Sequence, residues 1–123
     1  MEGTIAKGLG EGSYFMSMPH YKKEIKKKLG FDAYPGTLNI KIEKNQHDVE
    51  KANPIKISGY TKGGKTFGGA SCYRAKIKDI SGAIIIPDIN KHKNGITEFI
   101  AEVHVKTKLK IDDGDKVKIE MFN

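Results

Sequence analysis

A glycine-rich segment near the N-terminus contains residue types that could hold a phosphate group. It lies between an expected strand at 2–7 and an expected helix, and it reads Gly8, Leu9, Gly10, Glu11, Gly12, Ser13. Glycines at alternate positions let backbone amides approach an anion closely and form a phosphate nest. Many glycine-rich turns bind nothing, so the segment by itself indicates either a plain turn or a phosphate loop.

Two polar residues further along could hold a metal ion. Thr37 and Asn39 alternate with Leu38 and Ile40, so the two polar side chains share one face of an expected strand. Mg²⁺ prefers oxygen ligands and keeps waters and substrate phosphates, so a hydroxyl and an amide oxygen can suffice as its protein ligands. An exposed polar strand face is the other interpretation of this pair.

A better-known phosphate motif occurs at residues 59–66, which read GYTKGGKT and match the pattern G-x-x-x-x-G-K-[ST]. That motif works only where the loop opens a helix, because the helix N-terminus helps to hold the phosphates. Two more glycines and a run of β-forming residues follow here, which disfavour a helical turn. We therefore predict a hairpin turn at Gly63-Gly64 and no P-loop.

The elements that must position these residues are mostly strands. Alternating or β-rich runs predict strands at 2–7, 37–42, 55–59, 66–78, 82–86, 96–105 and 117–121. One clear helix is predicted at about 17–29, with Ser17 as N-cap, Pro19 in its first turn and Gly30 as C-cap. Six or seven strands with one helix indicate a mainly β fold, a small barrel with a helix packed on it.

Composition restricts the class of protein further. The 123 residues, with a formal net charge of +7, fit a single domain over 1–123 that attracts polyanions. Arg74 is the only arginine, which disfavours base readout in duplex DNA. Cys72 is the only cysteine, which excludes an internal disulfide and fits a reducing compartment. With no apolar run near about 18 residues and no signal-peptide pattern at the N-terminus, we expect a cytoplasmic protein without a membrane segment.

Two long stretches together resemble a known family. Residues 8–42 read GLGEGSYFMSMPHYKKEIKKKLGFDAYPGTLNIKI, and residues 81–119 read SGAIIIPDINKHKNGITEFIAEVHVKTKLKIDDGDKVKI. In residue identity and spacing, both stretches resemble the archaeal CTP-dependent riboflavin kinases. The middle of the chain, at about 43–80, matches that family only loosely. The resemblance implies a cradle-loop β-barrel of six strands and the reaction CTP + riboflavin → CDP + FMN.

The resemblance also implies a site. Thr37 and Asn39 would bind Mg²⁺, and Glu98 would contact the flavin. Our own hypothesis for the mechanism is that Glu98 also orients the ribityl hydroxyl, as a candidate base. The nucleotide would be held by the glycine loop, with its residues Gly8, Leu9, Gly10, Glu11, Gly12 and Ser13, and by a second strip made of Val103, His104, Val105 and Lys106. Asn90 occupies a flavin-contacting position where the family is expected to have threonine, so this sequence departs from the pattern there.

A DNA-binding barrel without enzymatic activity is the alternative. The tail at 109–119 is similar to hairpins of dimeric transcription regulators with related barrels, and small basic barrels bind DNA. Such a module should gather its basic residues on one face, whereas the lysines here are spread along the chain among Asp and Glu. We therefore expect a monomer that binds CTP or CDP and riboflavin or FMN, with neither nucleic acid nor membrane as partner.

Overall fold

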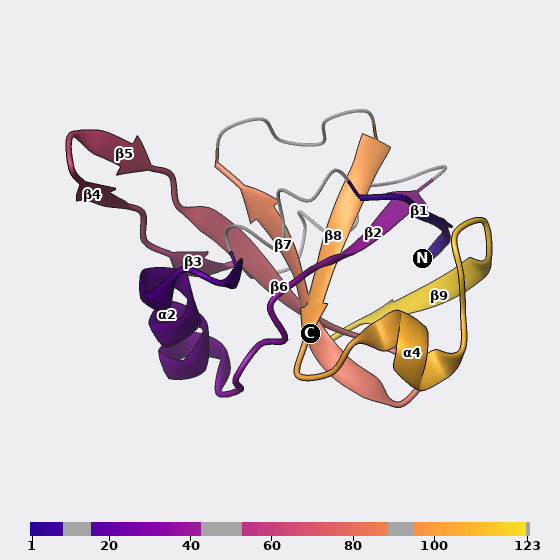
Figure 1. The fold of residues 1–123 in the computed structure, drawn as a ribbon. Coiled ribbons are helices and arrows are strands. Elements are labelled where there is room, and N and C mark those ends of the chain that lie inside the picture. Colours follow the sequence, from indigo (N-terminus) through magenta and orange to yellow (C-terminus); the bar gives the residue numbers. More distant parts are fainter. Residues whose placement is uncertain (9–15, 43–52, 89–94, 123) are drawn as a thin grey trace.

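The computed structural model describes residues 1–8, 16–42, 53–88 and 95–122. Strands are more numerous than helices in this part of the chain (Figure 1). The elements are β1 (Glu2–Ala6), α2 (Pro19–Leu29), β2 (Leu38–Ile42), β3 (Ile55–Ile57), β4 (Tyr60–Lys62), β5 (Lys65–Phe67), β6 (Ala70–Ile77), β7 (Ile80–Pro87), β8 (Ile96–Ala101), α4 (Val105–Leu109) and β9 (Lys116–Met121).

Six strands close into a barrel. They run β6-β7-β8-β2-β1-β9, and β9 pairs back onto β6, with every neighbouring pair antiparallel. Alternate residues of each strand point inward, so isoleucines and one phenylalanine fill the interior, among them Ile5, Ile40, Ile84, Phe99 and Ile119. The predicted six-stranded barrel with one main helix is confirmed. β3 is added to the edge of β6, and β4 pairs only with β5 among the described strands.

Helix α2 covers part of the outer surface of the barrel. Tyr21, Ile25 and Leu29, spaced at helical intervals, are buried against small and apolar side chains of the sheet. Gly30 ends the helix in the left-handed conformation, as predicted, with φ of 88°. The predicted N-cap was wrong: Met18 occupies that position without a side-chain cap, because the proline at 19 already lacks one of the amide groups that a cap would satisfy.

The segment at 59–66 forms a hairpin, as predicted. β4 and β5 pair in register around Gly63 and Gly64, whose φ angles are 59° and 79°. Two consecutive positive φ angles are the signature of a tight hairpin turn, which glycine adopts without a steric penalty. Because a strand follows this turn, no helix N-terminus faces the loop, and the rejection of a P-loop is confirmed.

The predicted strand at 96–105 is too long. β8 ends at Ala101, its last residue paired to β7, and the backbone oxygen of Ala101 accepts a hydrogen bond from Tyr34 N at 2.7 Å. Beyond this point the chain leaves the sheet and forms the short helix α4. The alternating pattern continues past Ala101 in the sequence, but β2 begins only at Leu38, opposite Phe99, so β8 has no paired strand on that side beyond this point.

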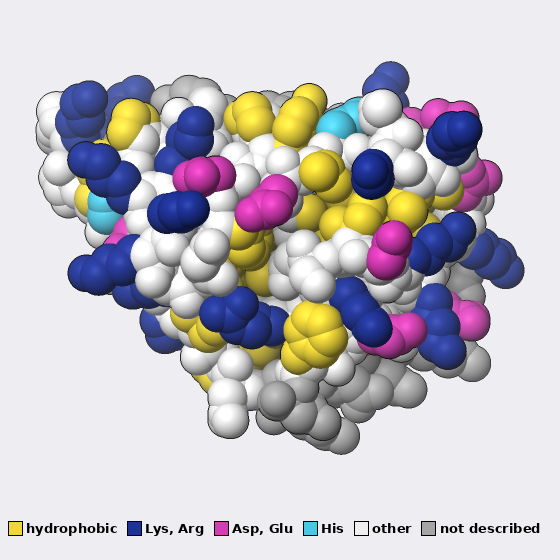
Figure 2. Space-filling model, turned by 90° about the horizontal axis from the view of Figure 1, so that it is seen from below, with side chains coloured by type: hydrophobic (Ala, Val, Ile, Leu, Met, Phe, Trp, Pro, Cys, Tyr) yellow, Lys and Arg dark blue, Asp and Glu magenta, His cyan; other side chains and the backbone are white. Residues whose placement is uncertain are grey.

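Charged side chains of both signs are interspersed on the face drawn in Figure 2. Lysines lie beside aspartates and glutamates on that face. Several ion pairs form in the described part of the chain, such as Lys56 with Asp88 at 2.8 Å. Basic charge is therefore not gathered there into the single patch that the DNA-binding alternative requires. Among the described helices, neither is long and apolar enough to cross a membrane.

Candidate active site

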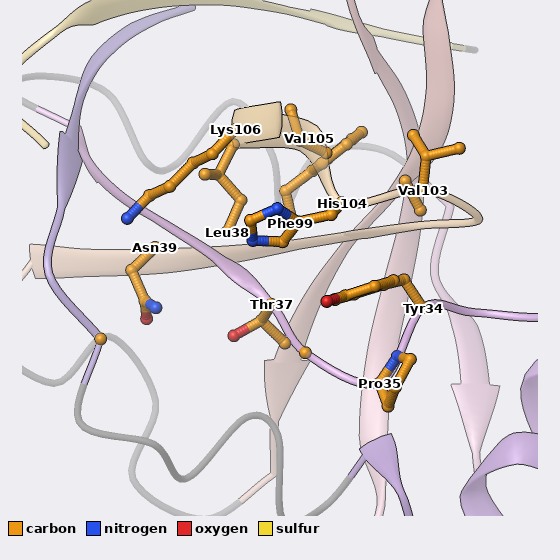
Figure 3. A pocket seen from close by; sticks show the side chains of 13 residues that line it. Tyr34, Pro35, Thr37, Leu38, Asn39, Phe99, Val103, His104, Val105 and Lys106 are labelled. Carbon is orange, nitrogen blue, oxygen red and sulfur yellow. The ribbon is translucent and has the colours of Figure 1, made fainter. Parts of the chain in front are cut away.

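A pocket of about 230 Å³ opens where the ends of β1, β2 and β8 meet α4. Because β2 lies between β1 and β8 in the barrel, segments far apart in the sequence meet here. The pocket is lined by Gly8, Tyr34, Pro35, Gly36, Thr37, Leu38, Asn39, Phe99, Ala101, Val103, His104, Val105 and Lys106. Figure 3 shows Thr37 and Asn39 below, with His104 and Lys106 above them.

Thr37 and Asn39 meet Glu98 across the β2–β8 pairing. Asn39 lies directly opposite Glu98 in the register. Thr37, just before β2 begins, donates a hydrogen bond from Oγ1 to Glu98 Oε1 at 2.8 Å. All three residues are half-buried. The predicted catalytic glutamate therefore contacts one member of the predicted metal pair and lies opposite the other, although it comes from a segment about 60 residues away.

Gly8 joins these residues from β1. Its backbone lies so close to Asn39 that a Cβ added at this position would overlap the side-chain nitrogen of Asn39. A larger residue at this position would displace the side-chain amide of Asn39, whereas glycine leaves that amide in place. This contact places the first residue of the predicted phosphate loop directly beside the predicted metal pair.

These residues have the donor types that Mg²⁺ requires. Thr37 directs its hydroxyl proton at Glu98, so the lone pairs of its oxygen remain available to a cation. With the side-chain oxygen of Asn39 and the nearby Glu98 carboxylate, these residues supply only hard oxygen ligands. Within the described ranges, no group of three or more His, Cys, Asp or Glu that could hold a metal ion is present.

The upper wall is the strip from Val103 to Lys106. Val105 is buried and anchors α4 in the barrel core. The ring of His104 is oriented by a 2.6 Å hydrogen bond between its Nδ1 and Thr107 Oγ1. The ammonium group of Lys106 pairs with Asp113 at 2.5 Å. An oriented ring and a fixed cation at the pocket wall suit a ligand that carries both a ring and negative charge.

Comparison with known proteins agrees with this geometry. A family model for CTP-dependent riboflavin kinases, described as domain of unknown function DUF120, matches residues 5–121. This chain belongs to that family. The resemblance noted in the sequence is thereby confirmed.

Curated members of the riboflavin kinase family match nearly the whole chain. A riboflavin kinase of Pyrococcus abyssi is 43% identical over 122 residues, covering 97% of this chain and 57% of that protein. One of Methanococcoides burtonii is 39% identical over 121 residues, covering 95% and 54%. One of Pyrobaculum calidifontis is 39% identical over 124 residues, covering 98% and 58%. The chain thus spans little more than half the length of these relatives.

The structure brings together most of the site residues that the family resemblance implies. One pocket is lined by Gly8, Thr37, Asn39 and the strip 103–106. Glu98 is hydrogen-bonded to Thr37 at the edge of this pocket. The predictions for Leu9, Gly10, Glu11, Gly12, Ser13 and Asn90 lie outside the described residues. The segment at 59–66 does not contribute to the pocket, as predicted.

Sequence reasoning missed the aromatic side of this pocket. Tyr34 lines it and packs against His104, with ring centroids 5.1 Å apart. In the sequence, Tyr34 stands just before Pro35 and Gly36, a pair typical of a turn. A tyrosine in a turn gives no signal of its own, and its exposed position in the folded protein is what marks it.

Proposed function

We propose that this chain transfers the γ-phosphate of CTP to riboflavin, giving CDP and FMN, with Mg²⁺ as the cofactor. The observation that carries the proposal is the Thr37–Glu98 hydrogen bond, which joins oxygen ligands and a carboxylate at one pocket. Membership of the family supports the choice of CTP, and the relatives named riboflavin kinase support the acceptor. We also keep the expectations of a monomer and of a cytoplasmic location as parts of this proposal.

The nucleotide is assigned to the pocket itself. Phosphoryl transfer depends on positioning and on charge neutralisation more than on covalent chemistry by the protein. Gly8 and the loop that it begins would approach the phosphates through backbone amides, while Lys106 supplies a cation on the facing wall. The two sides of the pocket would thus hold the phosphate chain between them.

Thr37 and Asn39 would hold Mg²⁺ beside those phosphates. When bound, the ion would offset the negative charge that develops during transfer. Glu98 orients the Thr37 hydroxyl by accepting its 2.8 Å hydrogen bond. The lone pairs of the hydroxyl oxygen would then face the cation. Glu98 therefore acts on the ligand set even if the Mg²⁺ ion does not contact its carboxylate.

Glu98 is also the proposed base. The terminal ribityl oxygen forms a bond to the γ-phosphorus as the bond from that phosphorus to the β–γ bridging oxygen breaks, and that oxygen leaves with CDP. The hydroxyl proton passes to the Glu98 carboxylate and then to solvent. Glu98 suits this role because it is half-buried at the rim of the pocket and is held in one orientation by Thr37.

One assay tests the proposal. The protein is incubated with riboflavin, Mg²⁺ and either CTP or ATP, and FMN is separated from riboflavin by chromatography. We expect FMN and CDP in equal amounts with CTP, and little FMN with ATP. If no nucleotide gave FMN, the proposed kinase activity would be wrong. Binding of DNA with a steep dependence on salt, without binding of riboflavin, would instead favour the DNA-binding alternative.

A further inference from the structure

Exposed apolar side chains gather at the mouth of the pocket. In the part of the chain that the structure describes, three large hydrophobic residues are exposed: Tyr34 at 40%, Val103 at 37% and Phe122 at 40%. Two of the three, Tyr34 and Val103, line the pocket, from segments about 70 residues apart. Apolar surface that stays in water beside a polar cavity is typical of a ligand-binding surface rather than of a folding core.

The ring of Tyr34 is held in place without a ligand. Its backbone N–H donates to Ala101 O at 2.7 Å, and its backbone oxygen accepts from Gly36 N at 2.8 Å, so the turn is tied to the end of β8. The ring packs on His104 at an interplanar angle of 42°. His104 is itself oriented by Thr107. A ring anchored in this way loses little conformational entropy when a ligand packs on it.

We propose that the exposed side of the Tyr34 ring, backed by His104, is the surface on which the base of the nucleotide stacks. This inference rests on the proposed function and adds a binding residue to it. A third ring inserted between two others needs their planes about 7 Å apart, twice the van der Waals spacing. The Tyr34 and His104 centroids are 5.1 Å apart, so the base lies against the pair and not between its members.

The nucleotide fits this wall better than the flavin does. Lys106, Thr37 and Asn39 line the same pocket as Tyr34, so one ligand there meets a ring at one end and phosphate-binding groups at the other. A nucleotide has both parts, whereas riboflavin carries a ring but no phosphate. The volume of about 230 Å³ also lies below the usual range for whole drug-sized ligands, so it cannot enclose both substrates.

Stacking by itself does not distinguish between bases, because every base has a π face. The Tyr34 ring should therefore contribute to affinity for the nucleotide and leave the preference for cytosine to hydrogen bonds elsewhere. This separates the role of Tyr34 from recognition of the phosphates, and the two can be measured independently with a ligand that has no base.

The test compares CDP with inorganic tripolyphosphate by isothermal titration calorimetry in the presence of Mg²⁺. For Tyr34→Ala we expect the Kd for CDP to rise by about 5- to 150-fold, which corresponds to the roughly 1–3 kcal/mol of one base–aromatic stack. The Kd for tripolyphosphate should stay at the wild-type value. Tyr34→Phe keeps the ring and should bind CDP like wild type.

Phe122→Ala is the matched control, since Phe122 is as exposed as Tyr34 but does not line the pocket. It should leave both dissociation constants unchanged. The inference is overturned if Tyr34→Ala binds CDP like wild type, or if it loses CDP and tripolyphosphate to the same extent. Failure of the proposed function looks different: the wild type then forms no FMN, whatever the Kd values of the variants.

Discussion

Thr37 and Glu98 are the two side chains on which the proposed chemistry depends most. The hydroxyl of Thr37 can make two kinds of interaction: it donates a hydrogen bond to Glu98, and its lone pairs remain for a cation. Asn39 stands opposite Glu98 on the neighbouring strand, and Gly8 leaves room for its amide. The positions of these side chains therefore depend on one another: Glu98 orients Thr37, and Gly8 leaves space for Asn39.

Loss of the predicted metal pair should change how the proposed formation of FMN depends on Mg²⁺. In Thr37→Ala combined with Asn39→Ala, both predicted protein ligands are removed. We expect half-maximal FMN formation to require at least about tenfold more Mg²⁺, since even residues that only orient a metal ligand change affinity by that factor. Thr37→Ser, which keeps the hydroxyl, should stay near wild type. An unchanged Mg²⁺ titration in the double variant would mean that the metal binds elsewhere.

Glu98→Gln tests the proposed base. Glutamine can still accept the hydrogen bond of Thr37 but cannot take a proton from the ribityl hydroxyl. We expect kcat to fall by about 10²- to 10⁴-fold, the usual contribution of a general base, with riboflavin and CDP still bound. Glu102→Gln, at an exposed glutamate just after β8, serves as the control and should keep wild-type kcat. Full turnover in Glu98→Gln would exclude the base role.

At the scale of elements, the turn at 112–115 connects the two walls of the pocket. Ile5 of β1 donates from its N–H to Asp115 O and accepts from Gly114 N, both at 2.8 Å, so the turn is fixed to the strand that leads to Gly8. From this turn Asp113 pairs with Lys106 of α4. The position of the Lys106 ammonium group is therefore set by a turn that does not itself line the pocket.

We predict that Asp113 acts through Lys106. The pair is partly exposed, with side-chain exposures of 31% for Lys106 and 47% for Asp113, and such pairs contribute about 0.2–1 kcal/mol. Asp113→Asn should therefore raise the KM for CTP by no more than about fivefold, leaving the KM for riboflavin unchanged. The same substitution made in Lys106→Met should have no further effect, which steady-state kinetics on both backgrounds can measure.

Asp79→Asn, in the turn between β6 and β7, is the matched control for the loss of one surface carboxylate. It should leave both KM values at their wild-type levels. If Asp113→Asn raised the KM for CTP equally with and without Lys106, the effect would come from the turn itself and not from positioning of the lysine.

At the scale of the whole molecule, the barrel has apolar surface on both sides of its wall. One cluster fills the interior, and a second lies outside, between the sheet and α2. Cys72 belongs to the outer cluster and is fully buried there. Burial raises the pKa of its thiol to about 12 from 9.0, because the thiolate would lose its hydration.

This pKa shift makes stability fall at high pH. Between pH 9 and 12 the unfolded chain loses the Cys72 proton while the folded protein keeps it, so the unfolded state binds fewer protons and the free energy of unfolding decreases as pH rises. We expect the decrease to be steeper than in Cys72→Ala by about 1.4 kcal/mol per pH unit. Below pH 9 the two slopes should match.

Urea unfolding of both proteins under reducing conditions, from pH 8 to pH 11, measures this difference. The comparison with Cys72→Ala removes the contribution of lysines and tyrosines, which titrate in the same range in both proteins. Parallel curves over the whole range would mean that the thiol ionises as easily in the folded protein as in the unfolded chain.

The sequence by itself determined the features that depend on neighbouring residues. The helix predicted at about 17–29 corresponds to α2, and Gly30 predicted its end. The glycine pair at 63–64 predicted the hairpin that excluded a P-loop. Such features could be predicted because helical periodicity and turn conformation are set within a few residues of chain. The family resemblance added the pocket residues Thr37, Asn39 and Val103 to Lys106.

Only the tertiary structure decided what the barrel brings together. The contact of Thr37 with Glu98 depends on the register of β2 against β8, and the contact of Tyr34 with His104 depends on where β8 ends. The length of β8 itself was mispredicted because its alternating pattern runs past the last residue that pairs with β2. Strand pairing and register are decided between distant segments, by which hydrogen bonds and buried faces can be satisfied together, and no local pattern contains that information.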